Sequence, residues 1–158
     1  TLKKLDLSSN RISDQGVKAN VDLSKNSFSV SGLRSLGSLM QRETSLTSLW
    51  LGRNAINDEG LECLIEGIVN CCSLQTLNLS INHSITAVGL TSLSTFFRSD
   101  NCCLEKLWLW GIDFGDDGAV ALAEGLMGNN SLTHVNFDSR GITSRGWSAF
   151  SKLLCDTS

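Results

Sequence analysis

One phrase of sequence returns along the whole chain at intervals of about 28 residues. Its apolar residues are spaced as Leu-x-x-Leu-x-Leu, and an Asn usually follows three residues after the last of them. The phrase begins at Leu2, Leu46, Leu74, Leu104 and Leu132. A fixed period of this length is typical of a solenoid, in which each unit buries its apolar face only by stacking on its neighbours. The repeat therefore predicts one long curved surface rather than a single deep pocket.

The pattern resembles the leucine-rich repeat, specifically the long ribonuclease-inhibitor-like subtype that occurs in NOD-like receptors and Ran GTPase-activating proteins. Leu46–Asn54 and Leu74–Asn82 carry the resemblance most clearly, and it extends over nearly all 158 residues. The resemblance implies an α/β solenoid shaped as a horseshoe arc. A parallel sheet is expected on the concave face and helices on the convex face.

Each unit is expected to contribute one strand and one helix, giving about six strands and five helices. Alternation with period two predicts these inward strand pairs: Leu5/Leu7, Val21/Leu23, Leu49/Leu51, Leu77/Leu79, Leu107/Leu109 and Val135/Phe137. Spacings of three and seven residues mark these helix faces: Leu33/Leu36/Met40, Leu61/Leu64/Ile68, Leu90/Leu93/Phe97, Ala119/Leu122/Leu126 and Trp147/Phe150/Leu154. The helix N-cap candidates are Ser29, Asn57, Thr86 and Thr143.

The chain is interpreted as a single leucine-rich repeat domain over residues 1–158, a fragment of a longer array with about five full repeats and one truncated unit near 11–26. Only 16 residues separate Asn10 from Asn26, so the helix expected after Gly16 is missing. Either a specialised bulge or a deletion explains the short unit. The strand residues Val21 and Leu23 are then expected to be poorly covered.

An Asn recurs just after the strand in four units, at Asn10, Asn26, Asn54 and Asn82. In the family this side chain turns inward and hydrogen-bonds backbone groups that leave the strand. Ile112 and Arg140 occupy the position in the last two units, where less regular turns are expected. Asn82 also begins a glycosylation sequon, which in a secreted protein would put a glycan on an inward side chain.

Charge and cysteine usage narrow the class of partner. The chain has 13 basic and 16 acidic residues without a basic cluster, which argues against nucleic acid and anionic membranes as partners.

The pairs Cys71–Cys72 and Cys102–Cys103 fall at equivalent turns of neighbouring units. A zinc site, an inter-repeat disulfide and reduced semi-buried thiols are all open, and vicinal spacing fits one zinc tetrahedron poorly. Reduced thiols and the inward sequon together favour a cytoplasmic protein.

No residues form a recognisable catalytic, cofactor or metal motif, so neither an enzyme nor a small-molecule substrate is expected. The outward strand positions are more informative, because three of the four tryptophans fall there. The candidate partner-binding residues are Trp50, Asn78, Lys106, Trp108, Trp110 and His134. Exposed aromatic side chains with polar surroundings are typical anchors of protein interfaces, although aromatics that merely cover the sheet would look the same.

The leading hypothesis is a non-enzymatic scaffold or sensing module that binds a protein partner through the concave face. The alternative is a GTPase-activating regulator resembling Ran GTPase-activating proteins, for which Arg11, Arg53 and Arg140 lie in or beside the relevant loops. A secreted or cell-surface recognition domain is a third reading.

Overall fold

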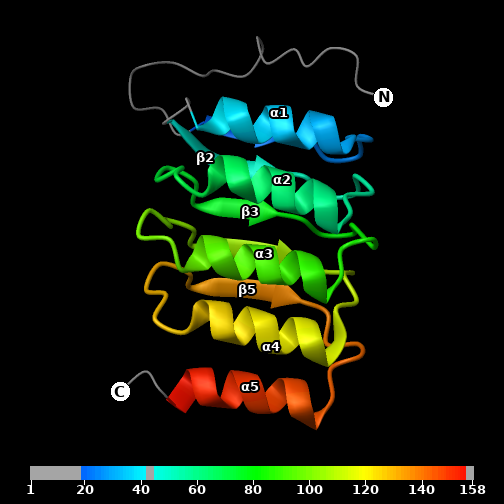
Figure 1. The fold of residues 1–158 in the computed structure, drawn as a ribbon, viewed down its shortest axis with the longest axis vertical. Coiled ribbons are helices and arrows are strands. Elements are labelled where there is room, and N and C mark those ends of the chain that lie inside the picture. The colour runs from blue at the N-terminus through cyan, green and yellow to red at the C-terminus, as the bar shows by residue number, and fades with distance from the viewer. Residues whose placement is uncertain (1–18, 42–44, 156–158) are drawn as a thin grey trace.

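The computed structural model describes residues 19–41 and 45–155, and these form five strand–helix units in regular succession (Figure 1). The expected strand at 2–7 and the short return after Gly16 lie outside the described residues. In chain order the elements are β1 (Ala19–Asp22), α1 (Val30–Met40), β2 (Leu46–Trp50), α2 (Asp58–Ile68), β3 (Thr76–Asn78), α3 (Ala87–Phe97), β4 (Lys106–Leu109), α4 (Gly115–Leu126), β5 (His134–Phe137) and α5 (Ser144–Cys155).

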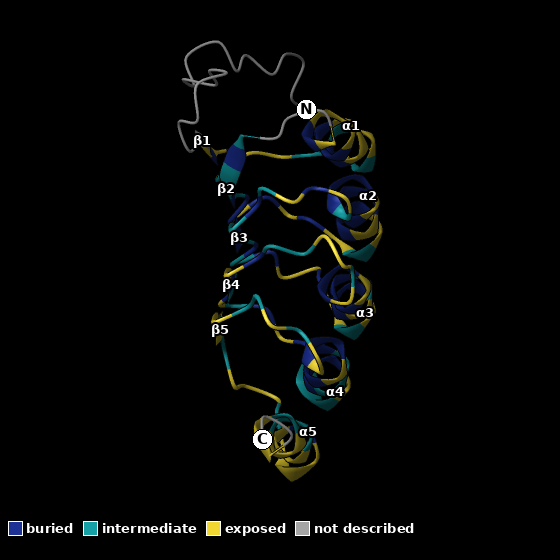
Figure 2. Ribbon diagram, turned by 90° about the vertical axis from the view of Figure 1, so that its left-hand side faces the viewer, coloured by how far each residue is buried: buried dark blue, intermediate teal, exposed yellow. Residues whose placement is uncertain are grey.

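The strands form one parallel sheet in the order β1-β2-β3-β4-β5. All five helices lie on one side of it, so the molecule has two layers (Figure 2). Neighbouring strands stand about 4.8 Å apart, whereas packed helices need about 8–10 Å. The stack therefore bends with the sheet on the inside, and the predicted α/β solenoid is confirmed.

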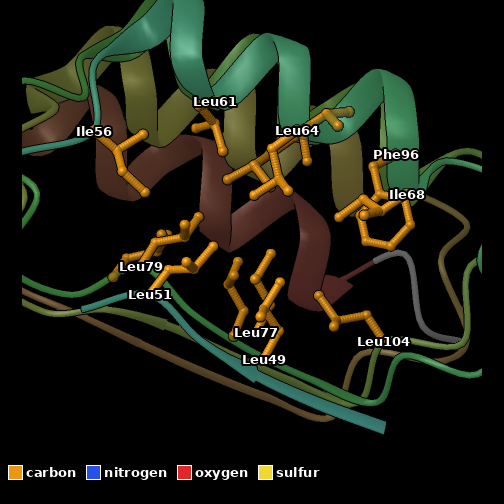
Figure 3. Close-up of a cluster of buried hydrophobic side chains, with 14 of the residues drawn as sticks. Leu49, Leu51, Ile56, Leu61, Leu64, Ile68, Leu77, Leu79, Phe96 and Leu104 are labelled. Carbon is orange, nitrogen blue, oxygen red and sulfur yellow. The ribbon is translucent and has the colours of Figure 1, made fainter. Parts of the chain in front are cut away.

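The core fills the space between the two layers. The strand leucines point toward the helix leucines (Figure 3), and Leu49, Leu77 and Leu64 are completely buried. Each unit seals its apolar face with its own helix and the adjacent units. Burial of this kind contributes about 25 cal/mol per Å² of apolar surface, so the internal units α2 and α3 are the best-covered part of the stack.

The Asn positions form the predicted ladder where the structure describes them. Asn54 donates its amide to the carbonyl oxygens of Leu23 (3.0 Å) and Leu51 (2.9 Å), and its Oδ1 accepts the backbone N–H of Asn26 at 2.7 Å. Asn82 Oδ1 in turn accepts the backbone N–H of Asn54 at 2.9 Å. Both amides are fully buried. The ladder joins consecutive units through groups that would otherwise be buried and unpaired.

Two helices receive a second cap from the preceding helix. Ser29, Asn57 and Thr86 act as N-caps as predicted. Asp58, in the first turn of α2, also accepts hydrogen bonds at the start of α3 from Thr86 N (2.8 Å), Thr86 Oγ1 (2.7 Å) and Gly89 N (3.0 Å). A Cβ at Gly89 would lie 2.6 Å from this carboxylate, so glycine is needed there.

The same arrangement joins α4 to α5. Asp116 accepts hydrogen bonds from Thr143 N (2.7 Å), Thr143 Oγ1 (2.6 Å) and Gly146 N (3.0 Å). The Thr143 donors hold the pKa of the Asp116 carboxyl below its usual range. Since a carboxylate at a helix N-terminus also interacts well with the helix dipole, each Asp stabilises the unit that follows its own.

Three expectations about coverage are wrong, and the first concerns Leu154, which was expected on the inward face of its helix but is 75% exposed. Val21 and Leu23 are not poorly covered, because both are buried in the same cluster as Leu33 of α1. Trp147 is not a core residue: 46% of it is exposed. It packs at the edge of an aromatic group with Phe137 and Phe150. Within the described residues, α5 has a neighbouring helix on one flank only, so nothing there covers the outer edge of this group.

Candidate functional site

The open face of the sheet presents three rows of side chains. Strand pairing aligns the central row across all five strands as Asp22, Trp50, Asn78, Trp108 and Asn136. The amino-end row holds Asn20, Ser48, Thr76, Lys106 and His134. The carboxyl-end row continues past the strands as Ser24, Gly52, Ser80, Trp110 and Asp138, held by backbone hydrogen bonds such as Ile81 N to Trp110 O (2.8 Å).

The sheet brings the three predicted tryptophans onto this one face. Trp50 and Trp108 are half-buried and flank Asn78 in the central row, while Trp110 is 50% exposed in the carboxyl-end row. Their strand neighbours Leu49 and Leu107 fill the core on the opposite side of the sheet. The indoles therefore cover the sheet from outside.

Two polar groups in the central row are incompletely paired. Asn78 Oδ1 accepts the backbone N–H of Ser80 at 2.9 Å, and its amide nitrogen has no partner within residues 19–41 and 45–155. The Nε1 of Trp108 is buried and also lacks a hydrogen-bond partner in the described part of the chain. A buried, unpaired donor of this kind costs about 1–3 kcal/mol. The face thus holds a donor whose hydrogen-bonding capacity is unused.

Lys106 and His134 lie side by side at the amino end of the sheet. They are paired in the strand register, and both are exposed. Thr133 Oγ1 lies 2.8 Å from Nδ1 of His134, which orients the ring. The structure therefore places all six predicted residues on the concave face, with the cationic Lys106 at one edge.

A cavity of about 310 Å³ lies where the strands end, next to Trp110. Sequence reasoning missed it, because loops of four successive units build it. Its lining residues are Arg53, Ile81, His83, Trp110, Gly111, Ile112, Asp113, Asp138 and Arg140. Asp138 Oδ2 and Arg140 Nε form an ion pair at 2.8 Å within it. The signal that could have indicated the cavity is Gly111, at a position where other units carry a side chain.

The vicinal cysteines lie at the opposite edge of the sheet. All six thiols of the chain are free, with Cys71 buried and Cys72 exposed. Burial is the main cause that raises the pKa of the Cys103 thiol, and the nearby thiols of Cys72 and Cys102 add to it. In the part of the chain that the structure describes, no three His, Cys, Asp or Glu residues are grouped to hold a metal ion.

Sequence comparison matches the Leucine Rich repeat family model at residues 1–19, 43–64 and 70–94. NACHT, LRR and PYD domains-containing protein 3 of Bos taurus is 37% identical over 121 residues, which is 75% of this chain and 12% of that protein. Protein 12 of the same series from Mus musculus is 36% identical over 123 residues, or 75% and 11%. Protein 5 from Homo sapiens is 30% identical over 156 residues, or 99% and 11%. The chain thus spans only about an eighth of the length of these relatives.

Solved structures share the fold at low sequence identity. The leiomodin-1 actin-binding site 2 structure has a TM-score of 0.72 and 16% identity, covering 86% of this chain and 78% of that one. The tropomodulin C-terminal domain of Caenorhabditis elegans has a TM-score of 0.67 and 20% identity, covering 89% and 84%. No helix in the described residues is long and apolar enough to cross a membrane. Repeat pattern, fold and relatives together identify the chain as a leucine-rich repeat protein, with repeats of the type that NOD-like receptors carry.

Proposed function

We propose that the concave face of the sheet binds a protein partner, with Trp50, Trp108 and Trp110 as its anchors. The observation that carries this proposal is the position of three indoles outside the core on one face of one sheet. The family and relatives suggest a protein-interaction module. Large aromatic side chains in a polar surround contribute most of the binding energy at protein interfaces.

The polar surface of the sheet between the indoles is suited to contact with a peptide backbone or a polar side chain of the partner. Asn78 lies between Trp50 and Trp108, and its amide nitrogen has no partner among the residues that the structure describes. Trp108 Nε1 is an unpaired donor beside it. A small rotation of the indole on contact would let this N–H reach an acceptor on the partner. Binding would then recover a hydrogen bond that the free protein lacks. Lys106 and His134 extend the surface toward the amino end.

The test compares tryptophans on the two layers. The triple variant Trp50→Ala/Trp108→Ala/Trp110→Ala and the control Trp147→Ala would each be used to capture proteins from a cell extract, with quantitative mass spectrometry as the readout. We expect the triple variant to lose the specific binders and the control to keep them, because Trp147 lies on the helix layer. Circular dichroism melts check that both variants are folded. If the triple variant captures the same set of proteins as the wild-type chain, the binding site does not lie on the concave face.

We further propose that the chain acts without catalysis and in the cytoplasm. The buried amide of Asn82 supports the second point, because it donates to the carbonyl oxygens of Leu51 (3.0 Å) and Leu79 (2.6 Å) and a glycan could not be attached without breaking them. The exclusion of nucleic acid, membrane and small-molecule substrates rests on sequence alone and stays a prediction.

The alternative of a GTPase-activating regulator also stays a prediction, which the matched relatives do not support. A GTP hydrolysis assay with small GTPases tests it directly, and faster GTP hydrolysis in the presence of the chain would support the GTPase-activating function.

A further inference from the structure

The cavity beside Trp110, called here the rim pocket, opens because one side chain is missing. Arg53, Ile81 and Gly111 occupy equivalent positions in successive units, and all three have a left-handed backbone, with φ of 60°, 59° and 73°. The conformation therefore does not by itself demand glycine, since the other two units carry large side chains there. A Cβ at Gly111 would already lie 3.3 Å from Ile81 Cγ1. Any longer side chain would grow into the hollow.

The charges that line the rim pocket are unevenly distributed. Arg140 and Asp138 form an ion pair with each other, so they largely cancel. Arg53 is exposed, and its guanidinium has no hydrogen-bond or ion-pair partner within residues 19–41 and 45–155. Asp113, three residues after Trp110 in the same unit, leans toward Gly141, since a Cβ there would lie 2.7 Å from its Oδ1. The pocket is consequently cationic at its Arg53 end and anionic at its Asp113 end.

We propose that the rim pocket binds a short segment of the partner in which an Asp or Glu stands next to a large apolar residue. The carboxylate pairs with Arg53, whose planar guanidinium can hold both carboxylate oxygens. The apolar side chain packs on the exposed indole of Trp110 and on Ile81. Asp113 repels a carboxylate at the opposite end of the pocket from Arg53. The acidic side chain of the segment therefore lies toward Arg53.

This inference rests on the proposed function, because Trp110 belongs to both the rim pocket and the concave face. It adds the chemistry of the partner segment, which the tryptophans alone do not specify. An isolated polyanion such as inorganic phosphate fits less well, because Asp113 and Asp138 both face the same cavity. A basic segment fits poorly at the Arg53 end, where like charges would meet.

The experiment selects the ligand from random sequences. A displayed library of random 12-residue peptides is panned on the chain, and peptides that also bind the Arg53→Gln/Trp110→Ala double variant are removed. We expect the remaining peptides to be enriched in an Asp or Glu adjacent to Leu, Phe or Trp. Enrichment of basic peptides, or no enrichment over the double variant, overturns the proposal.

Fluorescence polarisation with the best selected peptide then separates the two ends of the contact. Arg53→Gln should weaken Kd about tenfold, near the low end of what one hydrogen bond to a charged group contributes, and Arg53→Lys should restore part of the loss. The matched control Lys152→Gln, an exposed residue of α5, makes the same change in net charge and should leave Kd within twofold. Raising the salt concentration should weaken binding by the wild-type chain more than by Arg53→Gln.

The two proposals fail differently. If Trp50→Ala and Trp108→Ala abolish capture of the natural partner while Arg53→Gln leaves it unchanged, the concave face stands and the acidic segment is wrong. If Arg53→Gln reduces peptide binding while the tryptophan variants of the central row leave natural binding unchanged, the rim pocket acts alone and the concave-face proposal fails.

Discussion

Asn54 and Asn78 are the same residue type in neighbouring units, yet their environments differ completely. Asn54 is fully buried and holds the backbone of two units, whereas Asn78 lies on the open face with one hydrogen bond to Ser80 N. Asn54→Ala should lower the free energy of unfolding by roughly 1–3 kcal/mol or more, because it leaves buried backbone groups unpaired. Asn78→Ala should change it by less than about 1 kcal/mol. Urea melts of both variants provide the comparison, and equal losses would contradict the ladder.

Counting residues along the repeat was enough to place these side chains on opposite sides of the sheet. The same counting put Trp50, Asn78 and Trp108 into a single row, because a period of two and a unit length of about 28 leave little freedom. It could not show that Trp108 Nε1 is unpaired, since that depends on side-chain rotamers. It did not show the rim pocket either, because Gly111 is the one residue that marks it in the sequence, and the left-handed backbone of Arg53 and Ile81 is not evident from their residue types.

At the scale of the elements, the carboxylate of Asp58 stabilises α3 rather than its own helix alone. Asp58→Ala removes three hydrogen bonds at the start of α3 and should cost about 1 kcal/mol, a typical value for a lost cap. The control is Glu59→Ala, which alters an exposed acid in the same turn of α2. Thermal melts should show a clear drop for Asp58→Ala and little change for Glu59→Ala. Equal drops would mean that the first-turn charge, and not the contact with α3, matters.

The corresponding Asp116 contact should make α5 sensitive to acid. Because the pKa of Asp116 in the folded chain lies below its usual value, its stabilising effect is present above the unfolded pKa, near 4, and is lost as the pH falls through the folded value. The melting temperature of Asp116→Asn should therefore be lower than wild type at pH 7, and the difference should shrink toward pH 3. Asp100→Asn, an exposed change outside this contact, should show no such dependence. A difference that does not shrink as the pH falls below the unfolded pKa would argue against the ionised cap.

Every helix and strand of the described residues corresponds to an expected repeat feature, because apolar periodicity determines which segments can bury a face. The link from Asp58 to Thr86 and Gly89 was not expected. The repeat pattern predicts Thr86 only as the N-cap of its own helix. Their contact joins residues 28 positions apart, and it becomes visible only when the units are stacked.

At the scale of the whole molecule, stability should follow the position of a unit in the stack. In α2 the buried residues are Gly60, Leu61, Cys63, Leu64, Ile65, Gly67 and Ile68, whereas in α5 only Gly146 is buried. Since each unit is stabilised mainly by its neighbours, hydrogen exchange measured by mass spectrometry should show slow exchange in α2 and faster exchange in α5. Uniform protection across all five helices would instead indicate one cooperative unit. The prediction that Trp147 lies in the core was wrong for the same reason. A repeat pattern shows which face of a helix is apolar, but not whether an adjacent helix covers that face.

The carboxylate contact that reaches from one helix to the start of the next has a consequence for how such a chain can be cut and rejoined. Each sequence repeat looks like an interchangeable cassette, but Asp58 and the groups it satisfies at Thr86 and Gly89 belong to different cassettes. A duplication, deletion or chimera with its junction between residues 58 and 89 separates the two halves of that contact. One product would then carry the Asp58 carboxylate without the donors whose hydrogen bonds it accepts. The other would carry Gly89 without the carboxylate that requires a glycine there. Junctions that keep Asp58 through Gly89 together preserve it, so the transferable module is offset from the repeat that the sequence displays.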